Sequence, residues 1–302
     1  MKIQCKGIAN KSAKGEILDV YFPCIEYGEK RISSELQISN NLNQELIEIN
    51  WNEEDLGKPI ENVEGAYLKL QLLSNKFVLP NSININGLFS NIPNVVWTNQ
   101  GPISIEEIDK KLHESKLNNN DLHIKSVDKF PCLTDYIVPR KVRIADTSRV
   151  RLGAYLSEGT TIMHEGFVNF NAGTLGSAMI EGRISAGVVV GNNSDIGGGA
   201  STMGTLSGGN DAKIFIGENC LLGANSGIGI SLGDNCTVEA GLYLTSGTKV
   251  TIFDNDVSKI IKAVELSGKP NILYYRDSTN GKVIAAENNK ISGLNKELHS
   301  ND

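Results

Sequence analysis

Several features that define whole classes of protein are scarce or absent in this sequence. Its 302 residues include five cysteines, none of them in a CxxC pair, so the spacing contains no zinc or redox motif. No stretch approaches about 18 uninterrupted apolar residues, and residues 1–9 are polar, so we expect neither a membrane span nor a secretion signal. Positive charge is also in deficit, with 29 Lys and Arg against 35 Asp and Glu. These shortages predict free thiols and a cytoplasmic protein without a nucleic-acid or membrane partner.

Proline is absent between Arg140 and Lys269, and glycine is concentrated in nearly the same interval. Of the 31 glycines, 21 lie in residues 151–250. Aliphatic residues recur here at every sixth position, in several series: Val138, Ile144, Val150, Leu156, Ile162 and Val168; Val190 and Ile196; Ile216, Leu222 and Ile228; Leu232, Val238, Leu244 and Val250. This period is typical of a β-solenoid, in which each hexad forms one short strand and one corner. About three hexads would close a triangular coil of about 18 residues, so about six coils are expected.

Three phrases within the repeats share one layout. They are VGNNS at residues 190–194, IGENC at 216–220 and LGDNC at 232–236. Gly, Asn and Asp tolerate a positive φ, so we expect them at corners, while the aliphatic residue before them points into the core. Cys220 and Cys236 hold the same place in their phrases, which favours small stacked side chains inside the prism over reactive thiols. The chain is therefore predicted to be mainly β, and its pattern resembles the left-handed parallel β-helix.

Composition divides the chain into three predicted domains: an N-terminal α/β domain over residues 1–135, a β-helix over 136–252, and a C-terminal extension over 253–302. In the first domain, alternating hydrophobicity over residues 16–22 predicts a half-buried strand. Ser104 and Glu107 have the spacing of a capping box, which predicts a helix from residue 105 to about 115.

The C-terminal extension is predicted to contain a hairpin. Residues 272–275 and 282–285 flank a turn with Asn280-Gly281, a strong hairpin signal. Residues 259–266 read as a strand, and residues 294–299 as a short helix.

Two segments break the hexad rhythm, residues 165–183 and 200–213, and loops that leave a rigid scaffold often carry sites. Within the first, Glu181 lies between Ile180 and Gly182, where desolvation would suit it to proton abstraction; the alternative is a solvated charge at an edge. Within the second, Gly204 has a backbone N–H that could face an oxyanion, and the alternative is a plain corner.

Other candidate residues also have alternative interpretations. His164 is the only histidine in the repeat region, so three-histidine zinc chemistry is excluded there, and it is either a base or a corner or subunit contact. A basic set near the end of the chain suits phosphate or pyrophosphate, or is simply a solvated face: Lys259, Lys262, Lys269 and Arg276.

Long strings in the repeat region resemble one specific family. They are MHEGFVNFNAGTLGSAMIEGRISAGVVVG, GGGASTMGTLSGG and GANSGIGISLGDNCTVEAGLYLTSGTKV, followed by KAVELSG and NILYYRDS. Together they resemble the tetrahydrodipicolinate N-succinyltransferases of bacterial lysine biosynthesis, in the branch typified by actinobacterial enzymes. The likeness runs from Val142 to Val250 and resumes at Lys262. No such match is evident to us in the N-terminal 130 residues beyond their general length and character.

The resemblance implies an activity and two catalytic groups. The activity is transfer of succinyl from succinyl-CoA to the amine of ring-opened tetrahydrodipicolinate, which gives N-succinyl-2-amino-6-oxopimelate and CoA. Glu181 matches the catalytic carboxylate of MIEGR, acting either as a base or as an acyl-anhydride nucleophile. Gly204 matches the oxyanion donor of STMG. Members of the family are homotrimers with active sites between neighbouring prisms.

The family's contacts to succinyl-CoA also map onto this chain. The matching positions are Arg183, Gly198, Ser201, Ala224, Glu239, Ala240, Gly247, Lys262, Tyr275, Arg276, Asp277 and Ser278. A guanidinium can grip a carboxylate through two hydrogen bonds, so Arg183 is expected to hold the succinyl carboxylate. Lys262 and Arg276 suit the phosphates of CoA.

This sequence departs from the family at one of the two positions that bind a metal. Some members bind magnesium at the trimer axis through an acid just before RVRLG and the glutamate of MHEG. Glu165 keeps the second position, but Ser148 stands at the first, with Asp146 two residues away. The departure argues against the metal, leaves Glu165 as the one ligand carried over, and implies no required cofactor.

Two other functions stay open at this point. One is another CoA-dependent N- or O-acyltransferase on the same scaffold, which would differ in its acyl donor. The other is a solenoid that binds or scaffolds without catalysis.

Overall fold

The computed structural model describes residues 1–34, 43–208, 211–254 and 257–289, which form two compact units, Met1–Pro131 and Cys132–Asp302. The helix predicted over residues 294–299 lies outside the described residues, and the three predicted domain ranges stay a prediction. In the part of the chain described, no helix is both long and apolar enough to cross a membrane.

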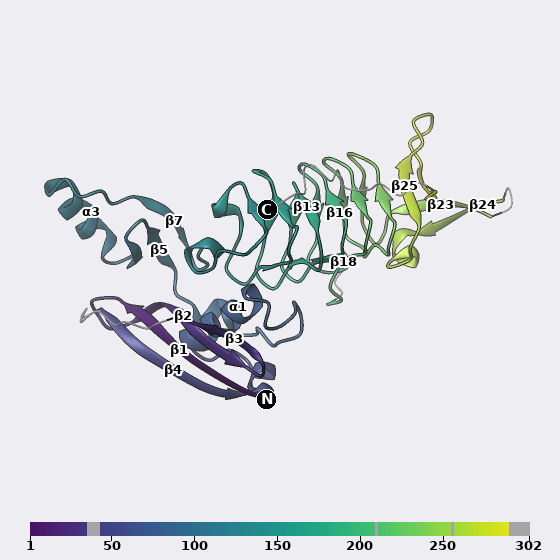
Figure 1. The fold of residues 1–302 in the computed structure, drawn as a ribbon. Helices are drawn as coiled ribbons and strands as arrows, with labels where there is room; N and C mark the ends of the chain where they lie inside the picture. Colours follow the sequence, from purple (N-terminus) through teal and green to yellow (C-terminus); the bar gives the residue numbers. More distant parts are fainter. Residues whose placement is uncertain (35–42, 209–210, 255–256, 290–302) are drawn as a thin grey trace. The chain divides into compact units, whose positions relative to one another are not determined.

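The first unit begins with a four-stranded antiparallel sheet in the order β3-β2-β1-β4 (Figure 1). Its strands are β1 (Lys2–Lys11), β2 (Ile17–Tyr27), β3 (Lys30–Ser33) and β4 (Gln44–Asn52). The strand predicted over residues 16–22 is thus confirmed as part of β2. Helix α1 (Val63–Ser74) packs against β2, where Gln71 accepts from the Phe22 N–H at 2.9 Å and donates to the Val20 carbonyl at 2.7 Å. Because Gln71 is fully buried, these two bonds give both its amide oxygen and its amide nitrogen a partner and fix the helix on the sheet.

A smaller three-stranded sheet completes the first unit, with β5 (Val95–Thr98) between β6 (Gly101–Ser104) and β7 (Ile124–Asp128). Other short elements of this unit are η1 (Glu53–Gly57) and α2 (Leu88–Asn91). Helix α3 (Ile108–Leu117) packs on the small sheet through Ile108 and Leu112, which contact buried Val96 and Leu122.

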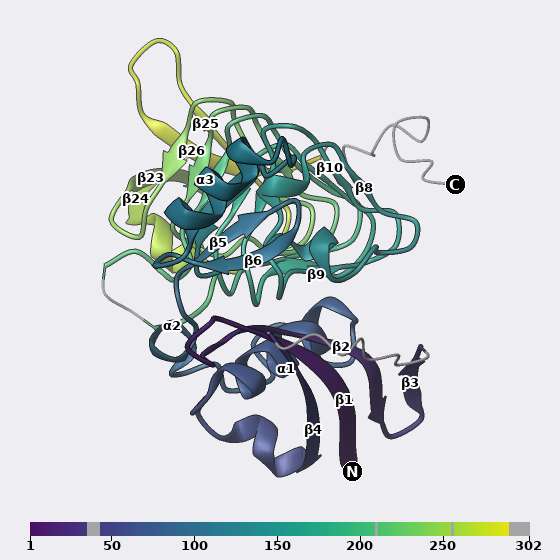
Figure 2. The ribbon, with the colours of Figure 1, turned by 90° about the vertical axis from the view of Figure 1, so that its left-hand side faces the viewer.

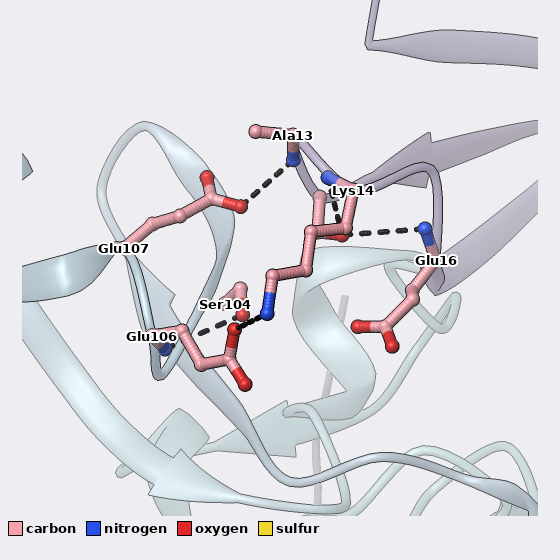
Figure 3. Close-up of polar contacts among 7 residues, drawn as sticks. Ala13, Lys14, Glu16, Ser104, Glu106 and Glu107 are labelled. Carbon is pink, nitrogen blue, oxygen red and sulfur yellow. Dashed lines mark hydrogen bonds and ion pairs between the residues drawn. The ribbon is translucent and has the colours of Figure 1, made fainter.

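The start predicted for this helix is wrong, because it begins at Ile108 and not at residue 105. The capping box does not form, and Figure 3 shows where its side chains point instead. Glu107 accepts a 2.7 Å hydrogen bond from the Ala13 N–H in the turn between β1 and β2, and Lys14 pairs with Glu106. A contact distant in sequence thus occupies the carboxylate that would have capped the helix, and Ile105 is left exposed.

The second unit is a β-solenoid with three parallel sheets, and its coils are stacked in Figure 1 and overlap in the view of Figure 2. One sheet contains β8 (Arg143–Ile144), β10 (Thr161–Ile162), β13 (Ala178–Ile180), β16 (Ser194–Ile196), β19 (Leu221–Leu222) and β21 (Thr237–Val238). The second contains β11 (Phe167–Val168), β14 (Arg183–Ile184), β17 (Ser201–Thr202), β20 (Gly227–Ile228) and β22 (Tyr243–Leu244). The third contains β9 (Tyr155–Leu156), β12 (Gly173–Thr174), β15 (Val189–Val190) and β18 (Phe215–Ile216). Two 3-10 turns precede the coils, η2 (Leu133–Asp135) and η3 (Thr147–Arg149).

The repeating aliphatic residues form the core of the solenoid, as predicted, with one exception. From Val150 to Val250 each of them is 0–2% exposed. Val138, however, is 83% exposed, so its predicted place in the core is wrong. It precedes the first strand, where no coil lies beneath it, and Leu133, which is 1% exposed, enters the core instead.

The coils vary in length more than the uniform repeat predicts. Paired residues 161 and 179 are 18 apart, 179 and 195 are 16 apart, and 195 and 221 are 26 apart. Residues 165–183 are therefore not a loop, contrary to expectation: Thr174 takes an aliphatic position there, and its hydroxyl meets the Thr160 hydroxyl at 2.6 Å. The extra residues of the long coil fall after β17, so residues 203–213 are a true insertion.

At the corners, the predicted positive φ is confirmed for the asparagines but not for the glycines of the three phrases, Gly191, Gly217 and Gly233. Asn193, Asn219 and Asn235 have φ of 59°, 54° and 60°. Their side chains also join neighbouring coils, since Asn193 donates to Asn219 at 2.7 Å. Cys220 and Cys236 are buried and stacked, with the Cys236 N–H 3.4 Å from the Cys220 Sγ, and all five cysteines of the chain are free.

The chain closes the solenoid with the predicted hairpin. Strands β25 (Ile272–Arg276) and β26 (Val283–Glu287) pair antiparallel, and Gly281 in their turn has φ of 74°. Strand β25 also pairs with β21, so the hairpin extends the first parallel sheet. The strand predicted over residues 259–266 is shorter than expected: β24 (Val257–Lys262) pairs with β23 (Lys249–Asp254) and gives way to the turn η4 (Ala263–Leu266). There the Glu265 carboxylate accepts from the Lys262 N–H at 2.9 Å and turns the chain.

Candidate active site

One corner of the solenoid carries most of the predicted site residues. It lies where the chain passes from the first sheet to the second, as from β13 to β14. Main-chain hydrogen bonds link this corner from coil to coil: the Gly199 N–H to the Glu181 carbonyl at 3.4 Å, Asn225 to Gly198 at 2.8 Å, and Gly241 to Ala224 at 2.9 Å. Residues 17 to 27 positions apart in the sequence are thereby joined along the prism.

Glu181 is the first residue of this corner and directly follows β13. Its N–H donates to the Ile196 carbonyl of the next coil at 2.8 Å, and its side chain is half-buried. A Cβ placed on Gly198 would lie 3.5 Å from the Glu181 Oε2 and 3.6 Å from the Glu165 Oε2. Two carboxylates therefore border one residue that has no side chain, which leaves space beside Glu181 for a small molecule.

Asp195 is a third acid at this place, and the sequence analysis missed it. It lies on β16, paired with Met179 on β13, and faces outward because its neighbour Ile196 is buried. Burial, and secondly the charge of Glu181, raises the pKa of Asp195 to about 6. The sequence pattern that singled out Glu181, a lone charge in an apolar stretch, could also have indicated Asp195.

Gly204 begins the insertion that follows β17. In the described part of the chain its N–H has no hydrogen-bond acceptor, while its carbonyl accepts from Ile214 at 3.4 Å. The insertion is held at Ser207, whose N–H donates to the Gly229 carbonyl at 2.9 Å and whose Oγ accepts from the Ser246 N–H at 2.6 Å. A fixed and unpaired N–H is what an oxyanion donor requires.

Arg183 and Ser201 are brought together on the second sheet. They are register partners on β14 and β17, and the Arg183 guanidinium donates to the Ser201 hydroxyl. Arg183 is exposed, so its remaining donors are open to solvent and to a ligand.

The other predicted contacts lie toward the hairpin end of the corner. The Glu239 carboxylate accepts a hydrogen bond from the Arg276 N–H at 2.8 Å. This bond joins the corner to β25 and brings Ala240, which follows Glu239, near Tyr275, which precedes Arg276. Ser278 is exposed in the hairpin turn, where the Asp277 carboxylate accepts from Thr279 at 2.8 Å. Hydrogen bonds from the hydroxyl and N–H of Thr279 hold the pKa of the Asp277 carboxyl below its usual range. Asp277 therefore stabilises the hairpin turn.

Gly247 and Lys262 also come close to each other, since the Ala263 N–H donates to the Thr248 carbonyl at 2.8 Å. Along the corner, the coils that contain Gly198 and Ala224 separate Glu181 from Glu239. The predicted residues thus form one elongated set and not one compact cluster. All four basic residues singled out, Lys259, Lys262, Lys269 and Arg276, are exposed.

The residues considered for magnesium do not fit a metal site within this chain. The Asp146 carboxylate is occupied by the N–H and hydroxyl of Ser148 at 3.0 and 2.6 Å, and Glu165 faces Gly198. Over the ranges that the structure describes, no three His, Cys, Asp or Glu side chains group to hold a metal ion. His164 is exposed.

Comparisons with known proteins connect this site to one chemistry. The family models "Hexapeptide repeat of succinyl-transferase" and "Tetrahydrodipicolinate N-succinyltransferase middle" match residues 213–246 and 92–131. The second match corrects the view that the first 130 residues have no counterpart in the family. The hexapeptide match also agrees with the left-handed parallel β-helix expected from the repeats.

Similar curated proteins have the same name in different organisms. The 2,3,4,5-tetrahydropyridine-2,6-dicarboxylate N-succinyltransferase of Pseudomonas aeruginosa is 56% identical over 239 residues, which are 78% of this chain and 70% of that protein. The enzyme of that name from Vibrio cholerae is 55% identical over 247 residues, 81% of this chain and 72% of that protein. A crystal structure of a putative 2,3,4,5-tetrahydropyridine-2-carboxylate N-succinyltransferase from Campylobacter jejuni superposes with a TM-score of 0.84 at 32% identity, covering 96% of this chain and 93% of that one.

The close approach of the insertion to Gly229 can be tested. A Cβ on Gly229 would lie 2.8 Å from the Met203 Sδ and 2.9 Å from the Ser207 Oγ, so Gly229→Ala should displace Ser207 and loosen the insertion that begins at Gly204. Amide hydrogen exchange at Ser207 and Ser246 should accelerate about tenfold or more. Gly57→Ala is the matched control, since a Cβ there meets no atom within 4 Å. Unchanged exchange in the Gly229 variant would contradict this packing.

Proposed function

The chain belongs to the tetrahydrodipicolinate N-succinyltransferase family, and from that premise we propose that it transfers succinyl from succinyl-CoA to the amine of ring-opened, hydrated tetrahydrodipicolinate. The products are N-succinyl-2-amino-6-oxopimelate and free CoA, a step of the diaminopimelate route to lysine. The observation that carries the proposal is the Glu181 carboxylate beside Gly198, since an amine acceptor needs both a base and room next to it.

Glu181 acts as the general base in this proposal. It takes a proton from the acceptor amine as the nitrogen attacks the thioester carbonyl, so that a C–N bond forms and the C–S bond then breaks. The Gly204 N–H donates to the oxygen that becomes negative in the tetrahedral intermediate. The electron pair of the broken bond leaves with the CoA sulfur, which ends as a thiol after protonation.

The donor would lie along the corner. Arg183 would hold the succinyl carboxylate while Ser201 fixes the guanidinium from the next coil. Lys262 and Arg276 would meet the CoA phosphates, and their exposure leaves them accessible. Ala224, Ala240 and Gly247 are exposed and small, so an extended pantetheine arm could lie against the prism there. Its border would be formed by Glu239, Tyr275, Asp277 and Ser278.

The assembly and location follow the family. We propose a homotrimer with active sites between neighbouring prisms, since a row of residues along one exposed corner leaves the outer side of the site open. The free thiols support a cytoplasmic location.

Replacing Glu181 tests the catalytic role directly. Glu181→Gln keeps the size of the side chain but removes the base, so turnover should fall about 10²–10⁴-fold while succinyl-CoA binding is retained. Turnover is measured as CoA release, and binding by calorimetry. Glu218→Gln is the matched control, because Glu218 is an exposed glutamate at a different corner. Wild-type turnover in the Glu181 variant, with its fold intact, would rule out the role assigned to Glu181.

Replacing Arg183 tests the choice of acyl donor. Arg183→Gln removes the cation for the distal carboxylate, so the preference for succinyl-CoA over acetyl-CoA in kcat/KM should fall about 10–100-fold. Exposed Arg140, changed to Gln, serves as the control. An unchanged preference would show that another group recognises the carboxylate.

The assembly is tested by mass. Light scattering under native conditions should give about three times the 32.7 kDa of one chain. The mass of a single chain would contradict the trimer.

A further inference from the structure

Asp195 is a half-buried carboxyl group without a partner. Within residues 1–34, 43–208, 211–254 and 257–289, its side chain has no hydrogen bond and no ion pair. The strands on either side of β16 present no charge to it, since its neighbours in the register are Met179 on β13 and Leu221 on β19. Among the described residues, Glu181 is the one charged group that acts on it, and it directly follows β13. A buried charge that no cation compensates costs stability, so its presence calls for a function.

The strand register places the two acids on the same outer surface of the solenoid. Met179 and Asp195 are cross-strand partners on the outer surface of the same sheet, and Glu181 lies two residues beyond Met179 at the edge of that surface. Glu181 directs its Oε2 toward Gly198, in the corner that follows Asp195 on the same coil. Gly198 also borders Glu165, so the two acids near Glu181 are Asp195 on the sheet and Glu165 across the corner.

We propose that Asp195 is a positioning residue for Glu181, and that the like charge of Asp195 holds the Glu181 carboxylate toward Gly198 and the acceptor. The inference rests on the proposed function, in which Glu181 takes a proton from an amine. An ionised Asp195 repels the Glu181 carboxylate, so it disfavours side-chain conformations of Glu181 that turn back over the sheet. Asp195 touches neither substrate in this arrangement, and it acts through Glu181.

The isosteric variant Asp195→Asn removes the charge and keeps the shape. At neutral pH kcat should fall about tenfold or more, while the KM values and succinyl-CoA binding change little, because the residue contacts neither substrate. Asp195→Glu should restore part of the rate. Asp109→Asn, an exposed aspartate in the first turn of α3, is the matched control.

A second measurement does not depend on turnover. The pKa of Asp195 is about 6 in the folded chain against an ordinary value of 3.8, so the folded state loses stability as pH rises from about 4 to 6 and Asp195 is ionised. Asp195→Asn should therefore melt at a higher temperature than the wild type at pH 7–8, and the difference should vanish below about pH 4.

The outcomes separate the two proposals. Wild-type kcat in Asp195→Asn, in an active enzyme, would overturn the role of Asp195 and leave the proposed function standing. Equal or lower melting temperature at pH 7–8 would overturn it as well, since Asp195 would then not be an uncompensated charge. A wild-type chain without succinyl transfer would refute the proposed function while the melting comparison still reports on the pair.

Discussion

The main-chain register between successive coils is the constraint on which the rest of this structure depends. The main chain of each coil forms hydrogen bonds with the coils before and after it. This register determines which residue of the next coil lies over each buried aliphatic residue. Glu181, Gly198 and Ala224 are neighbours only because of this stacking. The candidate site is therefore a property of the register and not of any local motif, and a slip of one residue would exchange its inner and outer side chains.

Close stacking also decides where glycine is required. A Cβ on Gly191 would lie 2.5 Å from the Gly217 carbonyl carbon, and one on Gly223 would lie 2.4 Å from the Ala240 nitrogen. Gly198 is different, because its nearest neighbours are carboxylate oxygens at ordinary contact distance. The first two glycines serve the packing of the coils, whereas the open side of Gly198 faces the proposed chemistry.

Local sequence patterns predicted the features that depend on local chemistry. The hexads, the asparagine corners and the hairpin at Gly281 each follow from one residue type at one spacing, and each is observed. Tertiary contacts explain the failures: Glu107 bonds Ala13 instead of capping its helix, and Thr174 occupies a core position because Thr160 satisfies its hydroxyl. Asp195 could not be paired with Glu181 from the sequence, since the 16-residue coil that joins them departs from the regular repeat. The roles of the site residues stay predictions that the experiments above address.

The most direct test of the central claim is release of CoA thiol from succinyl-CoA, with and without tetrahydrodipicolinate, beside the same assay with acetyl-CoA. The account predicts continuous release only when the acceptor is present, with a strong preference for succinyl-CoA. Release that prefers acetyl-CoA would contradict the assignment of the donor. No acceptor-dependent release from either thioester would contradict the transfer reaction itself.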